Sequence, residues 1–215
     1  MTLRLILTAA TALAMIAPAP AGAFENPAKI KVTEQSKGGA VLIRLPAQPA
    51  PYALQFSKNG SSGFLSRVYM IKIKPGAAAD FTWAAESWGP GRYRLDSIWQ
   101  QGHWSACLEQ GTFEVEVKAG KIAYLGMLDT DQLLASLQMQ VVRKGAVMQS
   151  GSSYFQSHGE TQVAPLRDRD EAGLTAARSF AETSMNGSGR LVELATTREV
   201  SFATSGAGKA IKTCG

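Results

Sequence analysis

The sequence predicts a mainly β protein: an antiparallel β-sandwich with one α-helix in its C-terminal region. Short runs of β-branched and aromatic residues alternate with Gly- and Pro-rich turns along most of the chain. One run, 112–118, alternates strictly between apolar and polar side chains, which is typical of a strand with one buried and one wetted face. Such a sheet needs a second layer over its apolar face, and this need predicts the sandwich.

The first 23 residues have the composition of a secretory signal peptide. Arg4 supplies one positive charge, 5–17 is almost wholly apolar, and Ala21-Gly-Ala23 provides the small residues of a cleavage site. The apolar run is too short to cross a bilayer, which takes about 20 apolar residues. We expect cleavage before Phe24, or two residues earlier after Ala19-Pro-Ala21, and a periplasmic or secreted protein.

The mature chain is expected to be one domain, 24–215. Removing 23 of the 215 residues leaves 192, a length that suits a single all-β unit. The net charge falls from +5 to +4, because Arg4 is the only charged residue removed. The cations are scattered along the sequence, so the composition predicts no nucleic-acid partner. It leaves the oligomeric state open.

Turn signals separate the strands that precede 112–118. Lys37-Gly-Gly39 lies between the first two runs and predicts that they form a hairpin. The run 64–74 is largely apolar in both alternating sets of side chains, which indicates a central strand covered on both faces. The expected strands are 30–34, 40–45, 52–58, 64–74, 81–86 and 92–101.

Ala119-Gly120 is a tight turn from 112–118 into the apolar run 121–128, so we expect these two strands to belong to one meander. The segment 131–145 fits a helix or a strand, with a strand slightly favoured in its second half. The polar segment 150–160 is predicted to be a loop.

One helix is predicted over 168–182. Asp168 can cap its first turn, Glu171 follows three residues later, and acidic side chains suit the positive end of the helix dipole. Asn186-Gly187 predicts where the helix stops. Its apolar stripe is Leu174, Ala177, Phe180 and Ala181, and two short strands, 191–196 and 199–203, are expected after it.

Cys107 and Cys214 are the only cysteines, and an even number in an exported chain predicts one disulfide between them. Closing a loop of about 100 residues stabilises a fold by at most ~4.7 kcal/mol in the chain-entropy model. The alternative is two separate thiols, with Cys107 buried and Cys214 on the C-terminal tail.

Motifs of common enzymes and cofactor sites are missing. The sequence contains no G-x-S-x-G, S-x-x-K or H-E-x-x-H motif. His103 and His158 are its only histidines, too few for a zinc site once the cysteines are paired. Gly206-Ala-Gly-Lys209 lacks the spacing and the Ser or Thr of a phosphate-binding loop. We therefore expect no catalytic residue, no metal and no cofactor.

The four tryptophans fall within 22 residues, and two of them are candidate ligand-binding residues. Trp88 precedes Gly89-Pro-Gly91, and Trp104 lies in a Gly- and His-containing turn, so strand parity assigns neither of them to the core. Exposed aromatic faces with a polar rim can bind sugars or partner proteins. The alternative is that these rings fill the core of the sandwich.

A hydrolase that uses acidic residues is a further hypothesis. Asp96 could act with Glu109 or with Glu86. Glycoside chemistry requires two carboxyl groups about 5–9 Å apart, and nothing in the sequence places such a pair.

Three motifs resemble small bacterial envelope β-sandwich domains of unknown function, which are transthyretin-like in type. The motifs are Pro90-Gly-Arg-Tyr93, Phe113-x-Val-x-Val-x-Ala-Gly120 and Tyr124-Leu-Gly126, and the resemblance covers about residues 64–128. It implies an envelope location and a sandwich fold but assigns no catalytic residue. Lipoprotein members carry a lipidated cysteine, which this chain lacks. We expect a non-catalytic binding or accessory protein whose partner is an envelope protein or a glycan.

Overall fold

The computed structural model describes residues 26–48, 51–59, 68–74, 81–100, 104–108, 111–131, 133–135, 139, 155–159, 163 and 165–200; only the backbone is described at 99–100, 104–107 and 155–159. The strands are β1 (Gly39–Pro46), β2 (Tyr52–Lys58), β3 (Val68–Ile73), β4 (Phe81–Trp88), β5 (Gly91–Gln100), β6 (Trp104–Leu108), β7 (Thr112–Val117), β8 (Ile122–Met127), β9 (Phe155–Gly159), β10 (Val192–Leu194) and β11 (Thr197–Val200). The helices are α2 (Glu171–Ser184) and the 3-10 turns η1 (Pro27–Lys29) and η2 (Gly189–Leu191). The predicted signal peptide lies outside the described residues.

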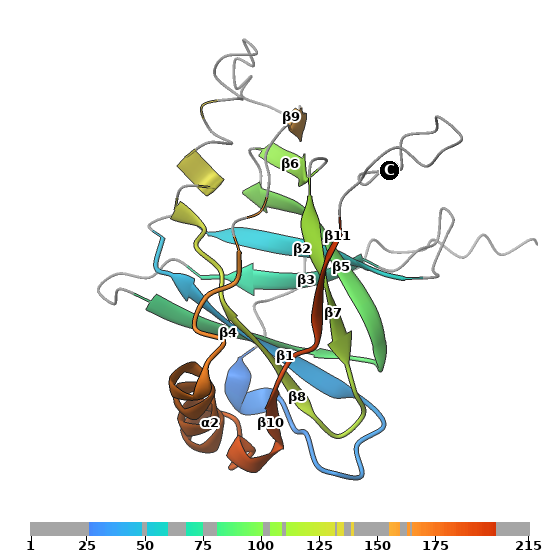
Figure 1. Ribbon diagram of the computed structural model, residues 1–215, viewed down its shortest axis with the longest axis vertical. Helices are drawn as coiled ribbons and strands as arrows, with labels where there is room; N and C mark the ends of the chain where they lie inside the picture. The colour runs from blue at the N-terminus through green and yellow to red at the C-terminus, as the bar shows by residue number, and fades with distance from the viewer. Residues whose placement is uncertain are drawn as a thin grey trace, which may run out of the picture.

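The strands form two sheets, and the predicted fold class is confirmed: a mainly β, two-sheet protein with one α-helix near its C-terminal end (Figure 1). The smaller sheet has the order β10-β8-β1-β4. The larger has the order β11-β7-β5-β2-β3, with β6 added to β5 and β9 added to β6. The pairing is not wholly antiparallel as predicted, because β8 runs parallel to β1 and β10, and β9 runs parallel to β6.

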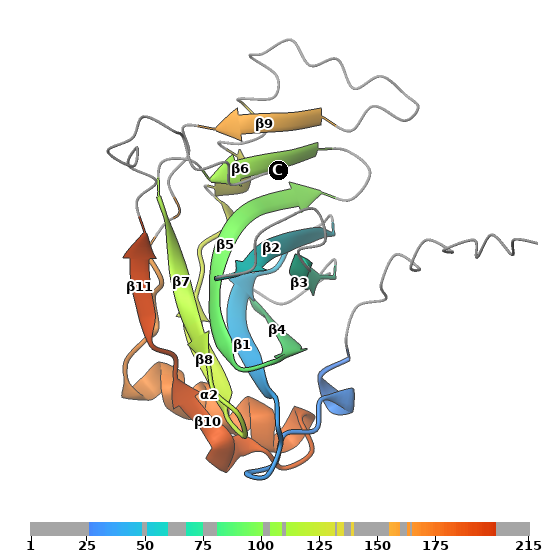
Figure 2. The ribbon, with the colours of Figure 1, turned by 90° about the vertical axis from the view of Figure 1, so that its right-hand side faces the viewer.

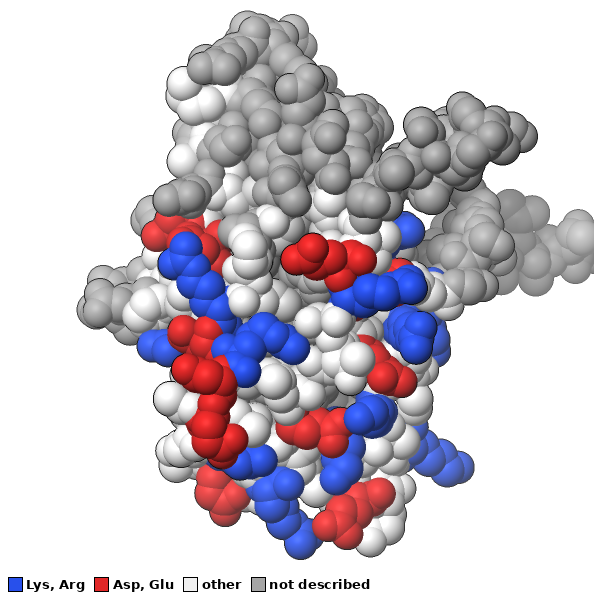
Figure 3. All heavy atoms as spheres, in the orientation of Figure 1, with Lys and Arg blue, Asp and Glu red and all other residues white. Residues whose placement is uncertain are grey.

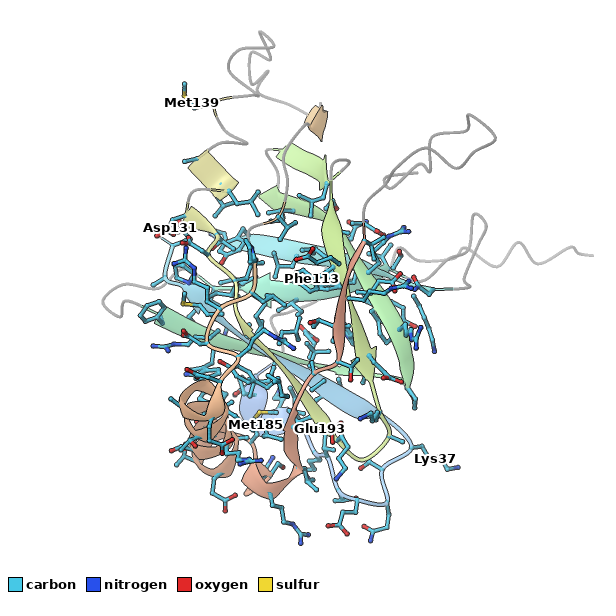
Figure 4. All side chains as sticks on the ribbon, in the orientation of Figure 1. Lys37, Phe113, Asp131, Met139, Met185 and Glu193 are labelled. Carbon is cyan, nitrogen blue, oxygen red and sulfur yellow. The ribbon has the colours of Figure 1, made fainter. Side chains whose placement is uncertain are left out.

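The two central strands of the four-stranded sheet, β1 and β8, are buried on both faces. On one face Val41 and Ile43 pack with Leu54 and other residues of the larger sheet. On the opposite face Leu42 packs against Ala177 and other residues of α2. Figure 2 shows α2 and the larger sheet on opposite sides of β1 and β8, and Figure 4 shows Phe113 between the sheets and Met185 beside the helix. The fold therefore has three layers: sheet, sheet and helix.

The connection from β7 to β8 crosses between the two sheets, so the predicted meander is wrong at this point. The turn at Ala119-Gly120 is present, but β7 pairs with β5 and β11 while β8 pairs with β1 and β10. Every residue of β8 is buried. A strand that is apolar on both faces belongs in a sheet covered on both sides, and only the smaller sheet is covered by α2.

The predicted N-terminal hairpin is also wrong. β1 forms as expected, but among residues 30–38 no strand is present. Instead Ile30 and Val32 are buried with the helix-side core of the smaller sheet. Their side chains thus cover the sheet face beside α2, a role that the alternation of 30–34 does not reveal.

A β-bulge in β5 changes which residues face the core. The register between β2 and β5 shifts between Gln55 and Phe56, so Leu95 and Ile98 both point into the core. The intervening Asp96 and Ser97 both face away from the core, as the two residues of a bulge do. The hydroxyl of Thr112 donates a 2.7 Å hydrogen bond to the Leu95 carbonyl.

The helix forms where predicted but begins later. Asp170, not Asp168, is the N-cap, and its carboxylate accepts a 2.9 Å hydrogen bond from the Gly173 amide. Asp168 instead adopts a positive φ of 52° ahead of the helix. The predicted stop is confirmed, because Asn186 and Gly187 follow the helix with φ of 55° and 71°.

Other predictions meet the structure only in part. β9 lies within 150–160, which was predicted to be a loop. Most of 131–145 lies outside the described residues, but its described residues 131, 133–135 and 139 are helical, which follows the helix alternative. All of 60–67 lies outside the described residues, so β3 is described from Val68 only.

The alternation of β7 predicts unequal effects of a charge on its two faces. Val115 is 1% exposed between the sheets, whereas Glu116 is half-buried on the opposite face. Val115→Asp should lower the free energy of unfolding by about 3 kcal/mol or more, because it buries an unpaired charge. Glu116→Lys should cost less than about 1 kcal/mol, since it creates only a like-charge pair opposite Arg92. Urea unfolding measures both, and equal effects would contradict the strand register.

Candidate functional site

Trp88 lies in the core between the two sheets. Its side chain is 5% exposed, and its ring centroid lies 5.0 Å from that of Phe56, 5.7 Å from Tyr69 and 4.7 Å from Tyr93. The edge-on and tilted contacts are the geometries that aromatic pairs prefer. Trp88 therefore follows the core alternative that the sequence left open, and it offers no ring face to a ligand.

Trp104 and Cys107 both lie in β6, where only the backbone is described. Trp104 is paired with Gln100 and Phe155, and Cys107 is paired with Ser97 and His158. Cys214 lies outside the described residues. The ligand-binding role of Trp104 and the Cys107–Cys214 disulfide stay predictions.

Asp96 and Glu86, one of the two carboxylate pairs suggested for a hydrolase, do not share a sheet. Asp96 is on β5 of the larger sheet, Glu86 is on β4 of the smaller one, and Glu109 lies outside the described residues. Asp96 is 3% exposed and accepts a 2.6 Å hydrogen bond from Arg94. Burial raises the pKa of Asp96, while hydrogen bonds from Ser57 and Arg94 oppose the rise.

Glu114 is a second buried carboxylate on the same face of the larger sheet. It accepts a 2.6 Å hydrogen bond from Asn59 and a 2.8 Å bond from Arg198, and it is paired in register with Arg94. Because a buried charge needs a hydrogen-bonded counterpart, these contacts explain how Asp96 and Glu114 are tolerated. The arrangement is a structural ion-pair network, and it corrects the expectation that the polar face of 112–118 is fully wetted.

A different cluster stands out on the helix side of the smaller sheet, and we call it the aromatic strip: Phe81, Arg44, Trp83 and Phe180. The Arg44 guanidinium carbon lies 4.1 Å from the Phe81 ring centroid and 6.0 Å from that of Trp83. The Trp83 and Phe180 rings are stacked, with centroids 5.0 Å apart and planes 15° apart. The strip thus joins β1, β4 and α2 through cation–π and stacking contacts.

The position of Arg44 in β1 directs its side chain away from the core between the two sheets. Arg44 follows the apolar run of β1 and is paired with Trp83 of β4. By strand alternation it shares the face of Leu42, which α2 covers. Arg44 lies beside the segment that precedes α2, and its Nη1 is 3.2 Å from the Asp168 carboxylate.

Arg169 anchors this segment to the sheet. It donates hydrogen bonds of 2.5 Å to the Leu125 carbonyl and 2.7 Å to the Ala195 carbonyl. Burial lowers the pKa of Arg169, opposed by Tyr124. At Gly126, where φ is 105°, a Cβ would lie 2.4 Å from the Arg167 carbonyl oxygen, so only glycine lets the segment pack this closely. Asp168 is thereby held in reach of Arg44.

Tyr124 lies beneath the aromatic strip. Its side chain is fully buried, its ring lies 5.9 Å from Trp83, and its hydroxyl has no hydrogen-bond partner within the described part of the chain. Burial, together with the Asp168 carboxylate, raises the pKa of Tyr124 to about 12, and Arg44 opposes the rise. The hydroxyl therefore stays protonated at neutral pH, so Tyr124 is poorly suited to act as a base or nucleophile.

Exposure is concentrated at the Phe81 end of the strip. Phe81 is 38% exposed, and the side chains of Arg44 and Asp168 are 28% and 37% exposed. Trp83 and Phe180 are half-buried because each covers the other. The sequence contained one overlooked signal for this site, a lone arginine within the apolar run 40–45.

The charged side chains of the described surface do not form a patch of one sign on the face shown in Figure 3. On that face, Lys and Arg alternate with Asp and Glu. Among the described residues no group of three or more His, Cys, Asp or Glu side chains could hold a metal ion. No helix in the described ranges is long and apolar enough to span a membrane.

Comparison of the chain with protein-family models, with curated proteins and with solved structures finds no match. The functional argument therefore depends on the geometry of the aromatic strip and on the sequence.

Trp88 and Phe81 lie in the same strand and provide a matched pair of aromatic truncations. Trp88→Ala should lower the free energy of unfolding by about 3–5 kcal/mol, because it empties a packed core site. Phe81→Ala should cost less than about 2 kcal/mol, because 38% of the side chain is already exposed. Urea unfolding of both variants measures the difference. A loss at Trp88 no larger than that at Phe81 would contradict the core placement.

Proposed function

We propose that this protein is an exported, non-catalytic binding or accessory protein of the bacterial envelope, and that it binds a partner protein through the aromatic strip. The signal-peptide-like composition of residues 1–23 supports export. The resemblance of about 64–128 to envelope sandwich domains supports the location.

One observation carries the binding proposal: Phe81 is a large aromatic side chain, 38% exposed, and lies beneath a half-exposed arginine. Aromatic residues and arginine are enriched at protein interfaces and dominate their binding energy. Arg44 is already held in place by Phe81 and Asp168, so binding would cost little of its side-chain entropy.

The geometry favours a protein over a glycan as the partner. A sugar ring that stacks on a side chain needs a free aromatic face. Trp88 is buried, Trp83 is stacked on Phe180, and one face of Phe81 is covered by Arg44. A protein side chain can instead pack against the exposed part of Phe81.

The enzyme hypothesis has less support. The buried carboxylates Asp96 and Glu114 are each engaged by arginine, and the Tyr124 hydroxyl stays protonated at neutral pH. Each carboxylate is thus held by an arginine, and a protonated tyrosine hydroxyl is neither a base nor a strong nucleophile.

Alanine substitution of Phe81 tests the proposal. The mature protein is immobilised, its partner is recovered from solubilised native envelope and purified, and the dissociation constant is measured by titration. Phe81→Ala should weaken binding at least tenfold, because it removes the exposed part of the strip.

Leu194→Ala is the matched control, because Leu194 is also 38% exposed and lies in β10 at the opposite edge of the same sheet. It should change the dissociation constant less than twofold. Equal binding by Phe81→Ala and the unaltered protein, or an equal loss in Leu194→Ala, would refute the aromatic strip as the binding surface.

A further inference from the structure

β4 is an edge strand of the smaller sheet. Within the described part of the chain it is paired with β1 on one side only. An edge strand can pair with an added strand through its outward N–H and C=O groups. The aromatic strip begins in this strand, since Phe81 and Trp83 both belong to β4.

The register identifies which backbone groups of β4 face outward. In β1 the amide of Ala40 bonds to the Lys121 carbonyl and the carbonyl of Arg44 to the Leu128 amide. These two partners flank β8, so even-numbered residues of β1 direct their backbone groups toward β8 and away from β4. Odd-numbered residues of β1 must then bond to β4, and Ile43 is paired with Ala84. In an antiparallel pair both residues of such a position bond each other.

Alternation along β4 completes the assignment. Thr82 and Ala84 direct their N–H and C=O groups toward β1, whereas Phe81, Trp83 and Ala85 direct theirs toward the open edge. No hydrogen bond from these outward groups is present among the described residues. Phe81, Trp83 and Ala85 are alternate residues of β4, so their outward groups have the spacing at which an added extended chain could pair.

This part of β4 lacks the charged side chains and prolines that protect many sheet edges. Phe81–Ala85 contains no charged residue and no proline. Three of the other edge strands carry a charge: β3 carries Lys72, β11 carries Arg198, and the three-residue β10 carries Glu193 in a 2.8 Å ion pair with Lys118. Charged side chains and short length are the usual protection of sheet edges.

We propose that the partner adds an extended segment to the smaller sheet alongside Phe81–Ala85, as a fifth strand. The outward amides and carbonyls of Trp83 and Ala85 supply the backbone bonds. The segment places an apolar side chain opposite Trp83, where cross-strand neighbours lie about 4.5–5.5 Å apart, and against the exposed part of Phe81. This inference rests on the proposed binding function and specifies its mode.

Amide hydrogen exchange with a strand-forming peptide tests the mode. The probe is the acetylated, amidated peptide Lys-Thr-Val-Thr-Val-Thr-Lys at millimolar concentration. In the protein alone, the amides of Trp83 and Ala85 should exchange much faster than that of Ala84. The peptide should slow exchange at Trp83 and Ala85 at least tenfold and leave Leu194 unchanged.

Two controls remove the proposed bonds. The same peptide with every backbone amide N-methylated has no N–H group with which to pair along either of its edges, so it should give no protection; this control tests the bonds on the unaltered protein. Ala85→Pro removes one outward donor at an edge position where proline is tolerated, and should reduce the protection at Trp83.

Each contrary result overturns the proposal. Equal protection by the N-methylated peptide excludes backbone pairing as the cause, and slow exchange at Trp83 in the isolated monomer excludes a free edge. Protection that rises with protein concentration without peptide makes a second copy the occupant. If the purified envelope partner requires Phe81 but leaves the Trp83 and Ala85 amides unprotected, the binding function stands and strand addition fails. If the partner neither requires Phe81 nor protects these two amides, both the binding function and strand addition fail.

Discussion

Burial of β1 and β8, the central strands of the four-stranded sheet, on both faces is the constraint on which the rest of the structure depends. β1 and β8 alternate between a core shared with the larger sheet and a core shared with α2, as Val41 and Leu42 illustrate. A strand buried in this way must be apolar at nearly every position. β8 therefore cannot pair with the half-polar β7, so the chain crosses between the sheets at Ala119-Gly120 and β8 pairs in parallel with β1.

The same constraint creates the surface that we assign to binding. Arg44 interrupts an apolar strand on the helix-covered face, and it is satisfied there by Asp168 and Phe81. The positive φ of Asp168 and the anchoring bonds of Arg169 hold the segment before α2 against that arginine. The ring of Trp83 then fills the space between Arg44 and the helix, and Phe81 is left at the edge.

Local patterns predicted the elements well, because they depend on neighbouring residues. The alternation of 112–118 and the end of the helix at Asn186-Gly187 needed no knowledge of distant contacts. The bulge at Asp96, the choice of Asp170 as the cap and the parallel pairing of β1 with β8 depend on contacts between residues far apart in the chain. For the same reason, four clustered tryptophans could not be sorted from sequence.

Native-state hydrogen exchange tests most directly whether α2 is an integral third layer. The amides of Leu42 in β1, Tyr124 in β8 and Ala181 in α2 should all exchange with the same free energy, that of global unfolding, because uncovering the sheet exposes the core that these elements share. Exchange of Ala181 through a much smaller opening, with Leu42 and Tyr124 still fully protected, would show that the sheet does not depend on the helix and would contradict this account.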